Sequence, residues 1–177
     1  MNLKEKKINS KKIYDGVIMS VHVDEVELPN KEKSTREYSK HGKACCVVAK
    51  LENGKFLLEK QFRYPLNEVI YEFPAGKCDK DEDTKIAALR ELKEETGYSA
   101  ENIIFLGNVI PACAYSDEIL YIYYCDKLVK GDTHLDANEF LEVLEVSEEE
   151  IVQLIKQNKI QDSKTIAAFY KYQLMVK

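Results

Sequence analysis

The sequence predicts an α/β (α+β) sandwich, in which a few helices pack on a mixed β-sheet. Two observations favour this fold class. Short apolar or alternating segments, typical of strands, recur along the chain, whereas only a few segments have helical spacing. The two kinds of segment do not alternate strictly, so an all-parallel sheet is not expected. At 177 residues, the chain is long enough for one domain with a sizeable core.

The first predicted strands lie near the N-terminus. Within residues 13–28, apolar residues recur at every second position, as a strand requires: Val17, Met19, Val21 and Val23. Residues 29–31 have the composition of a turn, and a second strand follows near residues 36–39. We therefore expect this region to form an antiparallel extension.

Further strands are predicted after the N-terminal region. Apolar runs at residues 44–51 and 56–62 flank Asn53-Gly54, which is the strongest short-range signal for a hairpin. Further apolar runs predict strands at 69–73, 103–109, 119–124 and 140–146. The order of these segments is compatible with a mixed sheet.

The first predicted helix follows a tight loop that ends at Gly76. Asp83 or Thr84 is placed to cap its N-terminus, and Gly97 is placed for a left-handed C-terminal cap. Its apolar stripe is expected to dock on the core and consists of Ile86, Ala87, Leu89 and Leu92.

Two more helices are predicted near the C-terminus. Ser147 and Glu150 form a capping box, which opens a helix with Ile151, Leu154 and Ile155 on one face. The last helix starts at Ser163. Four of its residues are expected to pack inward: Ile166, Phe169, Tyr170 and Leu174.

The first helix carries an unusual concentration of negative charge. Helical spacing places Glu91, Glu94 and Glu95 on one side within about one turn. Like charges so arranged cost stability unless a cation neutralises them. Mg²⁺ takes oxygen ligands and commonly bridges carboxylates to substrate phosphates. Arg90 lies close enough to orient a carboxylate of this group.

The segment from Gly76 to Tyr98 reads GKCDKDEDTKIAALRELKEETGY. It resembles the Nudix box, with no departure at nine fixed positions: Gly76, Glu82, Arg90, Glu91, Leu92, Glu94, Glu95, Gly97 and Tyr98. The resemblance implies a Nudix-type α/β/α sandwich with a mixed β-sheet and an N-terminal antiparallel sheet. It also implies hydrolysis of nucleoside diphosphates linked to another group, with Mg²⁺ or Mn²⁺ as the cofactor.

Features outside the box resemble the ADP-ribose and nucleotide-sugar pyrophosphatase branch of that family. They span about residues 12–175 and are Arg36-Glu37, His41 to Ala44, Gln61 to Pro65, Glu72 to Gly76, Pro111, Ser116 to Glu118 and Asp162 to Thr165. In this branch the N-terminal strands often cross to a partner subunit. We therefore expect residues 1–42 to be a β extension of a single domain, residues 1–177, and the protein to be a homodimer.

The resemblance also assigns metal ligands and a catalytic base. Glu91 and Glu95, helped by Glu94 and the carbonyl of Ala75, are expected to bind the metal. Glu82 either binds an outer metal or braces the loop through Arg90. The general base is expected in a mobile loop after the box, at residues 135–140. Glu139 is the first choice, followed by Glu142 and Glu118.

Several residues are candidates for substrate binding. The guanidinium of Arg63 suits a phosphate, because it offers two parallel donors, but it also suits a salt bridge to Glu68 or Glu72. Arg36 is a second phosphate-binding candidate and, in a dimer, serves the neighbouring site. Glu72 either binds the nucleotide or supports the metal loop. Tyr64 and Phe62 are candidates to stack on a base, although a core position is the commoner role.

Composition excludes other classes of function. A net charge of −5 disfavours a nucleic-acid partner held by electrostatics. No apolar stretch approaches the roughly 18 residues of a membrane span, and the basic N-terminus lacks a signal-peptide core, so a cytoplasmic protein is expected. The five cysteines show no metal-ligand spacing, which predicts free thiols.

The predicted function is therefore Mg²⁺-dependent hydrolysis of ADP-ribose to AMP and ribose 5-phosphate. The alternatives within this class are other nucleotide sugars, such as a GDP-hexose. A non-catalytic ADP-ribose sensor is disfavoured because a sensor has no need of the intact metal cluster. An isomerase on a related fold would need a Cys and Glu pair in the pocket, and Cys113 is the one thiol that suits it.

Overall fold

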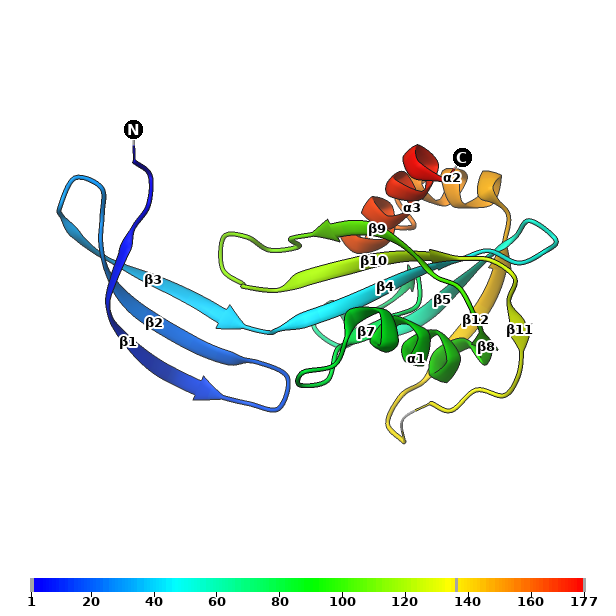
Figure 1. Cartoon of the computed structure of the whole chain (residues 1–177), viewed down its shortest axis with the longest axis horizontal. Coiled ribbons are helices and arrows are strands. Elements are labelled where there is room, and N and C mark those ends of the chain that lie inside the picture. The colour runs from blue at the N-terminus through cyan, green and yellow to red at the C-terminus, as the bar shows by residue number, and fades with distance from the viewer. Residues whose placement is uncertain (1, 136, 177) are drawn as a thin grey trace. The chain divides into compact units, whose positions relative to one another are not determined.

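The computed structural model describes residues 2–135 and 137–176. These residues divide into two compact units. The first consists of Met1–Gly42 with Ile110–Glu118, and the second of Lys43–Val109 with Ile119–Lys177. Figure 1 shows the strands and helices of both units.

The first unit is built on an antiparallel sheet of three strands: β1 (Lys6–Asp15), β2 (Ser20–Glu27) and β3 (Lys33–Lys40). The second predicted strand is confirmed as β3, but a continuous strand over 13–28 is wrong. The chain turns between β1 and β2, where Gly16 N donates to Met19 O (3.0 Å) and Val17 is fully exposed. Within β2 the buried residues are His22, Asp24 and Val26, opposite to the face that alternation predicted.

The second unit contains a mixed sheet and a smaller antiparallel one. The mixed sheet has the order β7-β4-β10-β9 and consists of β7 (Ala75–Lys77), β4 (Lys43–Ala49), β10 (Ile119–Cys125) and β9 (Ile104–Val109). Strand β10 runs parallel to β4, and the other pairs are antiparallel. The smaller sheet has the order β12-β5-β6 and consists of β12 (Leu141–Val146), β5 (Phe56–Arg63) and β6 (Glu68–Glu72). A separate pair joins β8 (Tyr98–Ser99) to β11 (Val129–Lys130).

Helices cover both faces of the mixed sheet (Figure 1). Alternate residues of β4 point to opposite cores, since side chains of a strand alternate between faces. Cys45, Val47 and Ala49 pack with α1 (Thr84–Thr96). Cys46 and Val48 pack on the other face with α2 (Glu148–Lys156) and α3 (Ser163–Met175). The predicted α/β/α sandwich with a mixed sheet is confirmed.

The predicted hairpin at Asn53-Gly54 is correct only at the turn. Leu51 N donates to Lys55 O (2.8 Å), and Gly54 has a φ of 83°, as the tight turn requires. The flanking strands β4 and β5 then separate into different sheets. A local turn signal does not report this separation, because it depends on the partners that each strand finds elsewhere.

The predicted helix ends are confirmed. The Asp83 side chain accepts bonds from Lys85 N (2.9 Å) and Ile86 N (3.3 Å), and Gly97 is left-handed with a φ of 76°. Ser147 and Glu150 form the reciprocal capping box of α2. These local signals succeed because each depends on a few neighbouring residues.

The predicted helix faces are partly wrong. In α1, Ile86 is 61% exposed, and Ala88 takes its place in the buried stripe. In α3, Phe169 is buried as predicted, but Ile166, Tyr170 and Leu174 are exposed. The buried face of α3 contains Thr165 and Tyr172 instead. Apolar character alone does not choose the face, because tertiary contacts recruit polar side chains.

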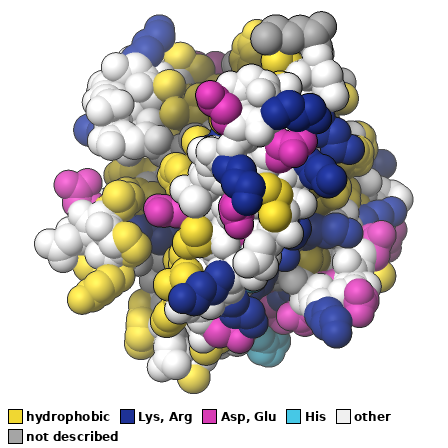
Figure 2. Space-filling model, turned by 90° about the vertical axis from the view of Figure 1, so that its left-hand side faces the viewer, with side chains coloured by type: hydrophobic (Ala, Val, Ile, Leu, Met, Phe, Trp, Pro, Cys, Tyr) yellow, Lys and Arg dark blue, Asp and Glu magenta, His cyan; other side chains and the backbone are white. Residues whose placement is uncertain are grey.

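The surface and the thiols complete the description. Figure 2 shows hydrophobic side chains at the surface, interspersed with Lys and Arg. All five cysteines are free, and Cys113 is the exposed one. Among the described residues, no helix has the length and apolarity that crossing a membrane would require.

Candidate active site

The site is built around the loop that links β6 to α1. Three contacts from different elements fix the start of this loop. Phe73 N donates to Thr165 Oγ1 of α3 (3.0 Å), Val47 N of β4 donates to Pro74 O (2.8 Å), and Ala75 N donates to Glu95 Oε2 of α1 (3.0 Å). The loop that carries the predicted carbonyl ligand of Ala75 is therefore held between a sheet and two helices.

Gly76 provides space for a carboxylate. A Cβ atom at this position would overlap the carboxylate group of Glu91. Gly76 is not among the residues with a positive φ, so its backbone does not need glycine for conformational reasons. The fixed glycine of the motif is therefore a cradle for Glu91.

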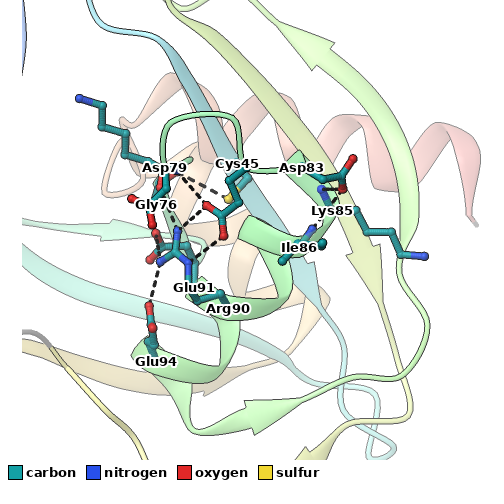
Figure 3. A network of polar contacts seen from close by, with 11 residues as sticks. Cys45, Gly76, Asp79, Asp83, Lys85, Ile86, Arg90, Glu91 and Glu94 are labelled. Atoms are coloured by element: carbon teal, nitrogen blue, oxygen red, sulfur yellow. Dashed lines mark hydrogen bonds and ion pairs between the residues drawn. The ribbon is translucent and has the colours of Figure 1, made fainter.

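Arg90 organises the outer carboxylates (Figure 3). Its Nε and Nη2 donate to the two oxygens of Glu82 (3.1 and 3.0 Å), and its Nη1 donates to Glu91 (2.8 Å) and Glu94 (2.9 Å). Glu82 Oε2 also accepts from Asp79 N (2.8 Å). Hydrogen bonding to Arg90 lowers the pKa of Glu82. Of the two roles predicted for Glu82, the geometry fits the brace.

A cleft of about 520 Å³ opens beside these residues. Its lining includes seven of the residues predicted for the site: Arg63, Ala75, Arg90, Glu91, Glu94, Glu95 and Glu139. It also includes Gly76, Lys77, Asp79 and His134. The box helix, the loop and the predicted base therefore meet at one surface.

Glu139 reaches the cleft from the segment before β12. Its Oε1 accepts a hydrogen bond from Gln61 Nε2 of β5 (3.2 Å). Asp136 of the same predicted loop lies outside the described residues. The second choice, Glu142, pairs with Lys60 (3.5 Å), and its side chain is 65% exposed. The third choice, Glu118, belongs to the first unit, where it lies 3.5 Å from His41.

Glu72 is buried between two cations. Its oxygens accept from Arg63 Nε (2.5 Å) and Arg63 Nη2 (2.8 Å), and Lys164 of α3 pairs with it from the other side. Lys164 also pairs with Asp162 (3.1 Å). Burial opposes ionisation, but Arg63 and Lys164 prevail and lower the pKa of Glu72. The salt bridge predicted as an alternative role for Arg63 therefore exists, while Arg63 still lines the cleft.

In a second group of buried carboxylates, burial outweighs the effect of any cation among the described residues. Burial, followed by the charges of neighbouring carboxylates, raises the pKa of Glu95 to about 10 and that of Glu59 to about 8. Burial likewise raises the pKa of Glu91, in spite of Arg90. The raised pKa values therefore favour the protonated form of these carboxyl groups while no cation is bound.

The donor set fits a hard divalent cation. Carboxylate oxygens and a backbone carbonyl are the ligands that Mg²⁺ accepts. The cradle at Gly76 and the unneutralised carboxylates of Glu59 and Glu95 both fit such an ion. In the conformation of the described residues, however, no three His, Cys, Asp or Glu side chains converge on one ion position. Arg90 engages Glu91 and Glu94 instead.

Three predicted substrate-binding residues are not part of the cleft lining: Glu72, Arg36 and Tyr64. Arg36 is in the first unit, where it forms a fork-shaped pair with Glu5 (2.9 and 2.5 Å). Tyr64 is 86% exposed and does not line the cleft. Phe62, the other aromatic candidate, is 49% exposed.

Sequence reasoning missed Glu59 and His134 and gave Lys164 no role of its own. For Glu59 a signal was present. It is an acid inside the apolar run of β5, two residues before Gln61 and four before Arg63, so all three share one face of the strand. No comparable signal pointed to His134.

Comparison with known proteins agrees with this geometry. The family model described as NUDIX domain matches residues 40–169, and the one described as nucleoside diphosphate sugar hydrolase N-terminal domain matches residues 5–39. An ADP-ribose pyrophosphatase of Bacillus subtilis is 38% identical, over 98% of this chain and 95% of its own. A methanol dehydrogenase activator of Bacillus methanolicus is 40% identical, over 96% and 93%.

A solved structure described as an ADP compounds hydrolase superposes with a TM-score of 0.87 at 19% identity. The superposition covers 98% of this chain and 95% of that one, and it shows that the two share a fold. The NUDIX match alone spans well over half of the sequence. The chain belongs to the NUDIX domain family and is a Nudix hydrolase.

Proposed function

We propose that the protein hydrolyses the diphosphate bond of ADP-ribose to AMP and ribose 5-phosphate, with Mg²⁺ as cofactor and Mn²⁺ as a substitute. The observation that carries the proposal is the cleft, in which the carboxylates of α1 face Arg63 and Glu139. The similarity to an ADP-ribose pyrophosphatase over nearly the whole chain supports the choice of substrate.

The residues of the cleft have distinct roles in this reaction. Glu91, Glu95 and Glu94, with the carbonyl of Ala75, would hold the metal, which when bound neutralises the diphosphate and acidifies water. Arg63 offers donors to a substrate phosphate. Glu139 accepts a proton from the water that attacks one phosphorus. The bond from that phosphorus to the bridging oxygen then breaks, and the two monophosphates leave.

The first test is a substrate panel with and without Mg²⁺. It compares ADP-ribose, GDP-mannose, UDP-glucose, NADH and a diadenosine polyphosphate. A coupling phosphatase releases phosphate from the monophosphate products, and this phosphate is measured. We expect metal-dependent turnover dominated by ADP-ribose. If another compound is preferred, the proposed mechanism stands, but ADP-ribose is replaced as the proposed substrate. Tight ADP-ribose binding without turnover would favour the sensor.

The base is tested by Glu139→Gln. Loss of the proton acceptor is expected to lower kcat by about 10²–10⁴-fold. KM should change little, because Glu139 is not assigned to substrate binding. A change confined to KM would remove Glu139 from the role, and Glu142→Gln would then be the next variant.

We also propose a homodimer formed through residues 1–42, with Arg36 serving the partner's substrate site. The exposed apolar side chains Ile13, Tyr14, Val17, Ile18 and Met19 support an interface on the first unit. Sedimentation velocity tests the dimer, and a monomer at assay concentration would contradict it. The five free thiols suit a reducing compartment such as the cytoplasm.

A second candidate function is activation of a methanol dehydrogenase, as the name of the Bacillus methanolicus relative states for that protein. The test adds the chain, with Mg²⁺, to a methanol dehydrogenase and measures the dehydrogenase rate. The Glu95→Gln variant separates activation that needs hydrolysis from activation by binding alone. An unchanged dehydrogenase rate would reject this candidate.

A further inference from the structure

Glu59 occupies an unusual position for a charged residue. It lies in the middle of β5, directly opposite Glu72 on β6 and Val143 on β12. Its side chain is almost fully buried, at 2% exposure. Because side chains alternate along a strand, it shares its face with Gln61 and Arg63. Arg63 lines the cleft, and Gln61 binds Glu139 there, so Glu59 lies on the side of the sheet that carries the site.

Among the described residues, one oxygen of Glu59 has no hydrogen-bond partner. Its Oε1 is buried and unsatisfied, unlike the oxygens of Glu72. A buried carboxylate oxygen without a donor costs several kcal/mol or loses its charge, so native proteins usually give it a partner. The free oxygen therefore indicates that a positively charged or proton-donating group is missing.

Three cations of the site are paired with other carboxylates. Arg63 and Lys164 pair with Glu72, and Arg90 pairs with carboxylates of α1. Among the charged neighbours, Glu59 contributes most to raising the pKa of Glu95, ahead of Glu91 and Glu139. Glu59 and Glu95 are thus both buried, and neither forms an ion pair with a Lys or Arg among the described residues.

We propose that Glu59 is a further ligand, direct or through one water, of the divalent cation that Glu95 holds. The inference rests on the proposed metal site. It adds one residue to the proposed ligands, and that residue belongs to β5 and not to the Nudix box. A divalent ion at this position gives the free oxygen of Glu59 its missing partner. It also allows both carboxyl groups to ionise, because its positive charge offsets theirs.

Mn²⁺ binding, measured without substrate, tests the proposal. Electron paramagnetic resonance counts free Mn²⁺ during titration of the full-length protein, and thermal unfolding is followed with and without the ion. Glu59→Gln is compared with Glu145→Gln, which makes the same change at an exposed position on β12 of the same sheet. Glu95→Gln serves as the positive control for the site.

We expect Glu59→Gln to weaken Mn²⁺ binding by about tenfold or more, as loss of a ligand or of its outer partner does. It should also raise the melting temperature of the metal-free protein and reduce the rise that Mn²⁺ produces. Glu145→Gln should behave as wild type. Unchanged Mn²⁺ affinity in Glu59→Gln, with binding lost in Glu95→Gln, would overturn this inference alone.

Binding unaffected in both variants would overturn the proposed metal site itself. If Glu59→Gln does not fold, Glu59→Asp keeps the charge and withdraws the oxygen by one methylene. Weaker Mn²⁺ binding by a folded Glu59→Asp would support the proposal. Wild-type binding by that variant would reject it.

Discussion

Glu59 and Glu72 face each other across β5 and β6, and the protein surrounds them in opposite ways. Both are 2% exposed. Glu72 lies between Arg63 and Lys164, and its pKa is lowered. Glu59 has an oxygen without a partner within the described residues, and its pKa is raised to about 8. Equal burial therefore leads to opposite charge states in the metal-free protein.

The difference separates two tasks of buried acids in one site. Where the fold supplies its own cations, the carboxylate is a fixed structural charge that orients Arg63 toward the cleft. Where the fold supplies none, as at Glu59, the proposed partner of the carboxylate is a divalent cation from solution. Replacing Glu59 and replacing Glu72 should therefore change the stability of the metal-free protein in opposite directions.

The largest expected effect concerns Glu95, the neighbour of Glu59 in the unpaired group. Glu95→Gln should abolish turnover, because it removes a proposed metal ligand. The fold should persist, since the amide retains an oxygen for Ala75 N. Steady-state kinetics and circular dichroism check these outcomes. Turnover at the wild-type rate would contradict the metal assignment.

The next largest effect is expected at Glu72, which is paired with Arg63 and Lys164. Glu72→Gln leaves Arg63 and Lys164 without their counter-charge, which should reduce the free energy of unfolding by about 3 kcal/mol. This lies at the low end for a broken buried pair, because the Arg63 side chain is 39% exposed and water screens it. Chemical denaturation measures the loss. Glu68→Gln, at an exposed position of the same strand, is the control and should change little.

A further expected effect is on pH dependence. The pKa values of Glu59 and Glu95 in the folded, metal-free protein lie above the ordinary carboxylate value, at about 8 and about 10. Stability from their bound protons is therefore complete below the unfolded pKa, and it is lost as pH rises through 8 and then 10. The slope should approach about 1.4 kcal/mol per pH unit for each proton released. Thermal unfolding in a chelator from pH 6 to pH 9 measures it.

Magnesium should reverse this trend, because a bound cation favours the ionised carboxylates. The stabilisation by Mg²⁺ should therefore increase with pH. If the stability of the metal-free protein does not change from pH 6 to pH 9, the pKa values of Glu59 and Glu95 are not raised, and the prediction is wrong.

The sequence predicted the parts of the site that local rules govern. Asp83, Gly97 and the charge-bearing face of α1 follow from spacing within one segment, and the structure places them as expected. The sandwich was also predictable, because alternation and apolar runs report burial on two faces. The roles of Glu91, Glu94 and Glu139 remain predictions that their shared cleft supports.

Features that depend on distant partners were not predictable. Lys164 reaches Glu72 over 92 positions of the chain, and no spacing rule covers such a distance. Apolarity put Tyr170 and Leu174 in the core, whereas Thr165 is fully buried because it binds Phe73 N. Glu59 was missed for a different reason: its place in an apolar run was a usable signal, but an acid is normally taken as solvent-exposed.

The hydrogen bond from Phe73 N to Thr165 Oγ1 has a consequence for folding during translation. A nascent chain that has emerged only as far as residue 160 contains the whole acidic box, yet lacks the hydroxyl that fixes the loop beside it. Such a chain should fold much of its sheet before it can hydrolyse anything. Enzymatic activity should therefore appear late in translation, when α3 has been made and docked.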